Sequence, residues 1–348
     1  MLQADHQVMT QLILRGYFDQ IRIFRDSQGY RDNMERLEDK KEGQWPPKPD
    51  FKLIKTVGTG SFGRAHLALH TRTNTYVVLK VLRKLDVIKL KQVEHTLDEK
   101  RILEALCNSC PFLVHLYGSF MDCEYLYLVL EYIQGGELFT YLQNADKLDN
   151  KSAKFYAAEV VLAFEYLHSA NVVYRDLKPE NLLIDSRGHI RVTDFGFTKH
   201  LEEDETHTLS GTPDYLAPEV IQAKGYGKAV DWWALGILIY EMIASHPPFF
   251  DDDPFHLYEK IVACHLSRRY GNLRDGALDI KMHPWFQGIN WDAMWELRMD
   301  APYIPDVEGD GDTSHFDEYE EDSELGLPHK DSPSKTAHAK ETSRKCVL

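Results

Sequence analysis

Apolar residues recur along the chain with two periods, and each period predicts a different kind of element. Residues 51–57, 64–69 and 76–80 are rich in β-branched and aromatic residues and predict short β-strands. Residues 93–106 repeat apolar positions at helical spacing, which predicts an amphipathic helix. Residues 230–244 are apolar on every face, which predicts a helix that is buried on all sides. The pattern therefore indicates a β-rich part followed by a helical part.

The first fifty residues form an extension ahead of the first predicted strand. Their apolar residues recur at near-helical spacing, namely Val8, Met9, Leu12, Ile13, Tyr17, Ile21 and Phe24. This spacing predicts an amphipathic helix that packs on the chain's own surface. Pro46 and Pro47 then end the helix before the first strand.

Charge and cysteine content narrow the class of protein. The net charge of −15 argues against general nucleic-acid binding. Five cysteines show no paired framework, which fits a reducing compartment and a cytoplasmic or nuclear location. The longest apolar run, residues 232–240, is too short to span a bilayer. Residues 302–324 contain ten Asp or Glu and no Lys or Arg, and from Ser323 onward the composition predicts disorder.

Candidate chemistry is concentrated in residues 174–181, Tyr-Arg-Asp-Leu-Lys-Pro-Glu-Asn, with Asp-Phe-Gly at 194–196 and Ala-Pro-Glu at 217–219. These residues supply a carboxylate for a hydroxyl, a lysine for a phosphate, and an amide and a second carboxylate for magnesium. Phosphoryl transfer needs those groups, because its catalysis is mostly positioning and charge neutralisation. A lone Asp-Phe-Gly would indicate only an ordinary turn. The three motifs in this order make chance a poor explanation.

Two further motifs lie upstream. Gly-Thr-Gly-Ser-Phe-Gly at residues 58–63 falls between two predicted strands, where glycines let backbone amides approach phosphates closely. Lys80 ends a predicted strand and Glu99 lies on the predicted helix, so that a pair between them would hold the lysine on the α- and β-phosphates. Taken singly, these would be a hairpin, a surface lysine and a solvated glutamate.

With these motifs the chain resembles the AGC group of eukaryotic protein kinases, and within it the cAMP-dependent kinases. The resemblance covers about residues 51–322 and includes the stretches 210–219, 230–236 and 309–319. Lys178 after Asp176 marks the serine/threonine branch. The implied fold is the α+β bilobal kinase fold, with ATP between the lobes. The implied parts are an N-terminal extension (1–50), a β-rich N-lobe (51–133), a helical C-lobe (134–290), an AGC-type tail (291–322) and a disordered end (323–348).

The resemblance also assigns roles to individual residues. Asp176 would orient and deprotonate the substrate hydroxyl, Lys178 would steady the γ-phosphate, and Asn181 and Asp194 would hold Mg²⁺. Asp231 would anchor the catalytic loop from the central helix. The residues expected to contact ATP are Val57, Gly58, Thr59, Gly60, Ser61, Phe62, Gly63, Arg64, Ala65, Val78, Lys80, Glu99, Glu131, Ile133, Glu137, Phe316 and Tyr319.

The resemblance further predicts a basic protein substrate. Glu137, Glu180 and Glu241 match positions that receive arginines upstream of the phosphorylated residue, and carboxylates in a groove favour such peptides. An apolar seat for the next substrate residue is expected from Leu209, Pro213 and Leu216. A cyclic-nucleotide-binding regulatory subunit is a candidate partner, because Tyr258 is family-like; His207 instead replaces a tryptophan at the expected contact.

Activation is expected to depend on Thr208, which lies where the family carries its activating phosphate. Arg175, Lys199 and His95 would hold that phosphate and order the loop. Residues 202–205 are all acidic, however, and a kinase that prefers basic peptides would phosphorylate itself poorly there.

Besides the acidic activation segment, two further departures from the family change the expectations. Ala65 and Val78 exchange the usual sizes at the adenine, and such volume-conserving exchanges are tolerated best. Between Cys264 and Ser267 only His265 and Leu266 remain, where family members carry a longer loop and helix. Arg269, the family partner of Glu219, is nevertheless retained. Two hypotheses therefore stay open: an active kinase, or a nucleotide-binding scaffold with little or no catalysis.

Overall fold

A computed structural model describes residues 51–60, 63–90, 92–122, 124–201, 205–206, 208, 210–263, 269–273 and 275–321. Several sequence predictions lie outside these residues: the helix and extension in 1–50, the roles of Ser61, Phe62, His207 and Leu209, the junction between Cys264 and Ser267, and the end of the chain after residue 321. The described chain divides into two compact units. The sheet unit contains residues 51–94, 115–132 and 316–321; the helical unit contains residues 95–114 and 133–315.

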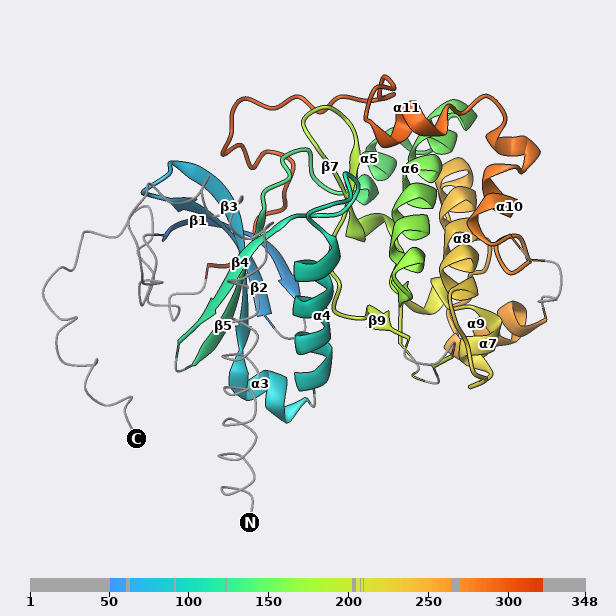
Figure 1. The fold of residues 1–348 in the computed structure, drawn as a ribbon, viewed down its shortest axis with the longest axis horizontal. Coiled ribbons are helices and arrows are strands. Elements are labelled where there is room, and N and C mark those ends of the chain that lie inside the picture. The colour runs from blue at the N-terminus through green and yellow to red at the C-terminus, as the bar shows by residue number, and fades with distance from the viewer. Residues whose placement is uncertain are drawn as a thin grey trace, which may run out of the picture. The chain divides into compact units, whose positions relative to one another are not determined.

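The sheet unit is built on five antiparallel strands in the order β1-β2-β3-β5-β4 (Figure 1). The strands are β1 (Phe51–Gly60), β2 (Gly63–His70), β3 (Thr75–Arg83), β4 (Leu116–Met121) and β5 (Tyr125–Glu131), with the short helix α3 (Lys84–Lys89) after β3. All three strands predicted from the apolar pattern are present and are a few residues longer than expected. Because side chains alternate between the faces of a strand, Val77, Leu79 and Val81 are buried with Phe51 and Tyr127 on one face.

The helical unit contains most of the helices. These are α4 (Val93–Leu106), which begins two residues before the unit, α5 (Leu138–Ala145), α6 (Asn150–Ser169), α7 (Pro218–Ile221), α8 (Ala229–Ala244), α9 (Pro254–Val262), α10 (Ala277–Lys281) and α11 (Trp291–Trp295). Short pairs β6 (Val172–Val173) with β9 (Lys199–His200) and β7 (Leu182–Ile184) with β8 (Ile190–Val192) complete it, together with the 3₁₀ turns η1 (Pro179–Asn181), η2 (Pro213–Tyr215) and η4 (Pro284–Phe286). The predicted helix at 93–106 has the bounds of α4.

Helices α6 and α8 lie side by side and form the centre of this unit (Figure 1). Phe164 of α6 meets Trp232 of α8 edge-on, with 5.7 Å between ring centroids. The prediction that α8 is buried on all sides is wrong. Gly236, Tyr240 and Ile243 are exposed and lie three or four residues apart, so one stripe of α8 faces solvent although it is apolar.

The two compact units do not coincide with the expected lobes, whose boundaries stay a prediction. Residues 95–114 were expected in the N-lobe but belong to the helical unit. The end of this stretch pairs with β8: the Val114 amide donates to the Val192 carbonyl at 3.0 Å, and the Val192 amide donates to the Phe112 carbonyl at 2.8 Å. The expected tail of residues 291–322 is also divided between the units: residues up to His315 belong to the helical unit, and residues from Phe316 belong to the sheet unit.

Candidate active site

The Asp176 carboxylate is the centre of the catalytic loop between β6 and β7. It is 2% exposed, and three side chains surround it. The Asn181 amide donates to its Oδ2 at 2.8 Å, the Thr212 hydroxyl donates to its Oδ1 at 3.0 Å, and the Lys178 ammonium lies 3.3 Å from Oδ2. The predicted residues Asp176, Lys178 and Asn181 therefore lie together. Thr212 of the activation segment, which was not predicted, also contacts Asp176.

The electrostatic setting of Asp176 makes it more basic than an ordinary carboxylate. Burial raises its pKa, and the nearby negative charge of Asp194 adds to the rise. Lys178 and the hydrogen bonds from Asn181 and Thr212 act in the opposite direction. A carboxylate with a raised pKa that is still hydrogen-bonded in one orientation is suited to accept a proton from a hydroxyl.

Asp231 holds the backbone of the loop from α8, as predicted. Its carboxylate accepts hydrogen bonds from the Tyr174 amide at 2.9 Å and the Arg175 amide at 2.8 Å. The third partner is the His168 ring, whose Nε2 lies 2.7 Å from Oδ2. The side chain of Asp231 is buried, so these partners replace the water it loses. The loop therefore has a fixed conformation immediately before Asp176.

The Asp-Phe-Gly motif lies against the same loop. Phe195 is 1% exposed and meets the buried ring of Tyr174 edge-on, with 5.6 Å between centroids. Asp194 is exposed and adopts a positive φ of 53°, which short polar side chains tolerate. The motif therefore buries its aromatic ring and presents its carboxylate to solvent close enough to affect Asp176.

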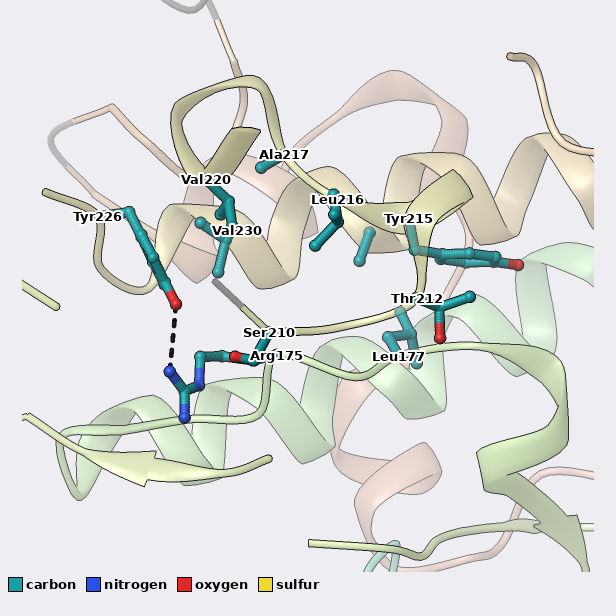
Figure 2. Close-up of a pocket in the computed structure, with 11 residues that line it drawn as sticks. Arg175, Leu177, Ser210, Thr212, Tyr215, Leu216, Ala217, Val220, Tyr226 and Val230 are labelled. Carbon is teal, nitrogen blue, oxygen red and sulfur yellow. Dashed lines mark hydrogen bonds between the residues drawn. The ribbon is translucent and has the colours of Figure 1, made fainter. Parts of the chain in front are cut away.

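The activation segment passes over the catalytic loop, and Tyr226 joins the two (Figure 2). The Arg175 guanidinium donates to the Tyr226 hydroxyl at 3.1 Å and to the Phe197 carbonyl at 2.7 Å. The predicted phosphate ligand Lys199 donates to the Thr206 hydroxyl at 3.0 Å. Two of the residues expected to bind a phosphate on Thr208 therefore have other partners here, and the third, His95, lies on α4 of the same unit.

The predicted substrate residues of the helical unit lie on three elements. Glu137 precedes α5 and pairs with Leu183 of β7, Glu180 lies in η1, and Glu241 lies on α8. Burial raises the pKa of Glu241, and the charges of Glu180 and Asp214 raise it further, so these carboxylates form one negative region. The Tyr215 hydroxyl donates to Glu241.

The predicted apolar seat is only partly available. Pro213 is exposed, whereas Leu216 is 6% exposed and packs in a cluster with Val173, Ala217 and Val220. A substrate residue can therefore contact Pro213 but little of Leu216.

The glycine motif forms the β1–β2 hairpin of the sheet unit. Gly58 pairs with Ala65 and Gly60 pairs with Gly63. A side chain at Gly63 would place its Cβ 2.0 Å from the Val81 carbonyl oxygen, so only glycine fits there. The hairpin backbone is therefore free of bulk where the sequence predicts phosphate contact.

One face of the sheet carries the predicted adenine and phosphate residues. Ala65 lies opposite Lys80 and Leu67 lies opposite Val78, and directly opposed residues point to the same face. Ala65, Val78 and Lys80 are all partly exposed there. The size exchange between Ala65 and Val78 thus concerns side chains on one face. The predicted pair between Lys80 and Glu99 joins residues of different units and stays a prediction.

Residues 316–321 pack on the same unit. Phe316 lies 5.8 Å from the Tyr132 ring, and Glu318 pairs with Lys55 at 3.0 Å. Glu321 accepts hydrogen bonds from both the amide and the hydroxyl of Thr56, at 2.7 and 2.8 Å. This acidic stretch therefore packs against β1 through Lys55 and Thr56. The glycine motif begins on the same strand.

Two contact residues could not be found from composition alone. Thr212 is one polar residue among several in its segment. Tyr226 had one signal, an isolated aromatic residue between Gly225 and Gly227. By contrast, the predicted pair of Arg269 and Glu219 is present, with two hydrogen bonds of 2.7 and 2.9 Å.

Comparison with known proteins identifies the class. Residues 51–286 match the protein kinase domain, so the chain belongs to the protein kinase family. It is 48% identical over 307 residues to the human cAMP-dependent protein kinase catalytic subunit PRKX, an alignment that covers 81% of this chain and 85% of that protein. It is 50% identical over 301 residues to the catalytic subunit from Dictyostelium discoideum, covering 80% of this chain but 46% of that protein.

A third relative is the cAMP-dependent protein kinase type 3 of Saccharomyces cerevisiae, 46% identical over 306 residues, with 81% of this chain and 76% of that protein aligned. These similarities confirm the resemblance to the AGC group, and the chain is a serine/threonine protein kinase of the cAMP-dependent type. Among the described residues, none of the helices is both long enough and apolar enough to cross a bilayer.

Proposed function

We propose that the chain transfers the γ-phosphoryl group of ATP to serine or threonine hydroxyls of proteins with basic residues upstream of the target. The observation that carries the proposal is the geometry around Asp176. A buried carboxylate is held by the Asn181 amide and the Thr212 hydroxyl beside the Lys178 ammonium. Phosphoryl transfer requires this combination of an oriented acceptor and a nearby positive charge.

Asp176 orients the incoming hydroxyl and accepts its proton. Its raised pKa brings it closer to the pKa range in which a carboxylate works as a general base. Lys178 is partly exposed, so its ammonium can contact a phosphate oxygen as well as Asp176. Asp231 acts on the loop backbone and keeps Asp176 in place.

Mg²⁺ fits the donor set on this loop. The family generally uses ATP with Mg²⁺, and this ion is held by one or two carboxylates together with substrate phosphates. The exposed Asp194 carboxylate and the Asn181 side chain are the residues that would hold it. When bound, the ion neutralises charge on the transferred phosphate. Asp194 lies close enough to Asp176 for their charges to repel, and a cation there would reduce that repulsion.

The preference for basic peptides follows from the carboxylates near α8. Burial raises the pKa of Glu241, and the negative charges of Glu180 and Asp214 add to that rise. A guanidinium would offset that repulsion and form charge-assisted hydrogen bonds. Substrates with arginine upstream of the target are therefore favoured over neutral ones.

A regulatory partner is also proposed. The relatives above are named catalytic subunits, and that name implies a complementary subunit in those proteins. In this chain Phe255 of α9 is 78% exposed and Phe250 is 65% exposed, with Tyr258 on the same helix as Phe255. A cyclic-nucleotide-binding subunit that inhibits the purified chain and is released by cAMP would support this partner; absence of binding would remove it.

A peptide kinase assay tests the main proposal. Purified chain, radiolabelled ATP and an Arg-Arg-x-Ser peptide should give incorporation well above that of an Asp176→Ala variant. Replacing both arginines by alanine in the peptide should raise its KM, and Glu241→Gln should reduce that difference. Incorporation equal to the Asp176→Ala control would reject the enzyme. Nucleotide binding without incorporation would favour the scaffold hypothesis instead.

A further inference from the structure

Tyr226 connects the activation segment to the catalytic loop through three groups of its own. Its backbone pairs with Thr206 in both directions, at 2.8 and 3.0 Å. Its hydroxyl accepts a hydrogen bond from the Arg175 guanidinium, 51 positions earlier in the chain (Figure 2). The same hydroxyl donates a hydrogen bond to the Thr208 carbonyl. The residue is 4% exposed, so water cannot easily replace these bonds.

Arg175 gives Tyr226 a fixed point of attachment. Its amide is bound to Asp231 at 2.8 Å, its Nε donates to the Phe197 carbonyl at 2.7 Å, and its backbone has a positive φ of 69°. A non-glycine residue keeps such a conformation only where its surroundings enforce it. Arg175 immediately precedes Asp176, so whatever binds Arg175 is positioned relative to the catalytic carboxylate.

The activation segment contacts the catalytic loop at a second place, at Arg175 and Asp176. Gly211 has a φ of 123°, and a Cβ there would lie 2.8 Å from the Arg175 carbonyl oxygen. Thr212 then donates to Asp176 at 3.0 Å. The segment is thus attached at Thr208, through Tyr226, and again at Thr212. Pro213, a predicted substrate-binding residue, directly follows the second attachment.

We propose that Tyr226 is a positioning residue, whose hydroxyl holds the Thr208 carbonyl on Arg175 and so orders the substrate-binding part of the activation segment when Thr208 carries no phosphate. The proposal rests on the proposed function. It adds a contact, from the Tyr226 hydroxyl to the Thr208 carbonyl, that does not require phosphorylation of Thr208. A phosphate would act on the Thr208 side chain, whereas Tyr226 acts on the Thr208 backbone. The two contacts use different atoms of Thr208, and Arg175 is expected to take part in both.

The effect of removing the hydroxyl can be anticipated. Tyr226→Phe keeps the ring among Val220, Val230 and the rest of its apolar cluster. It leaves an Arg175 N–H and the Thr208 carbonyl without their shared partner, which disfavours the ordered segment. Asp176 keeps its bonds to Asn181 and Thr212, so nucleotide affinity should change little while peptide turnover falls.

The test uses the full chain in a Thr208→Ala background, which removes any phosphate at that position. Tyr226→Phe is compared with Tyr156→Phe, a matched control that is also buried and whose hydroxyl has no hydrogen-bond partner among the described residues. We expect Tyr226→Phe to lower kcat/KM for the peptide about fivefold or more, which corresponds to about 1 kcal/mol. The control should match the parent, and the KM for ATP should be unchanged in both.

Hydrogen exchange supplies a readout that does not depend on catalysis. Amides of residues 205–212 should exchange faster in Tyr226→Phe than in Tyr156→Phe, while the amides of α6 stay protected in both. Equal kcat/KM and equal exchange in the two variants would overturn the proposal. If the parent transfers no phosphate at all, the proposed function fails; the exchange comparison then still decides the role of Tyr226.

Discussion

The Asp231 carboxylate is the contact through which α8 holds the catalytic loop, and Asp231→Asn perturbs it with almost no change in volume. Oδ2 faces both the Tyr174 amide and the His168 ring, and Oδ1 faces the Arg175 amide. An asparagine has only one oxygen. In either orientation of the amide, its NH₂ group points at a backbone N–H that cannot accept a hydrogen bond.

The size of the effect follows from those contacts. At least one hydrogen bond to a charged acceptor is lost, which costs about 1.5–3 kcal/mol, and the donor left buried adds to that cost. The remaining bonds lose the charge of their acceptor and weaken. We therefore expect a destabilisation of about 2–4 kcal/mol, which lowers the melting temperature by roughly 4–16 °C for a domain of this size.

Circular dichroism melting and the peptide assay measure the two consequences together. Asp231→Asn should melt lower and should lose kcat, because the loop that carries Asp176 is no longer held. Asp149→Asn is the matched control: Asp149 caps α6 by accepting from the Ser152 amide, and asparagine caps helices as well as aspartate does. A melting temperature and kcat equal to those of this control would refute the assigned role of Asp231.

Three further predictions concern Asp176, the sheet face and a buried pair. Thr212→Ala removes a bond that favours the charged form of Asp176, so the pKa of Asp176 should rise further and the acidic limb of kcat/KM should move to higher pH; an unmoved limb would contradict this. Ala65→Val and Val78→Ala should each weaken nucleotide binding, and the double variant should recover much of the loss, whereas strictly additive affinities would argue against the size exchange. Glu159→Ala removes the buried acceptor that lies 2.6 Å from His189 Nδ1 and 2.9 Å from the Ile190 amide, and should cost about 1–3 kcal/mol in urea unfolding; an unchanged midpoint would show that these hydrogen bonds contribute nothing.

The sequence alone determined the elements and the order of the motifs. Strands in residues 51–80 and the helix at 93–106 were predictable, because side-chain periods of two and 3.6 are set by neighbours within a few residues. The catalytic loop and the Asp-Phe-Gly motif were recognisable because their residue types occur at short, definite spacings. The predicted contact of Asp231 with this loop needed the family resemblance, since 57 positions separate Asp231 from Tyr174.

Only the tertiary structure decided which distant groups meet. The two hydrogen bonds that link Arg175, Tyr226 and Thr208 join segments whose local sequence patterns carry no information about one another. Which stripe of α8 is exposed could not be predicted either, because an apolar surface does not state which neighbours will cover it. The same reason applies to Phe112 and Val114, whose backbone pairing with Val192 joins segments about 80 positions apart. Periodicity fixes which face of an element is apolar, whereas long-range packing determines what that face contacts.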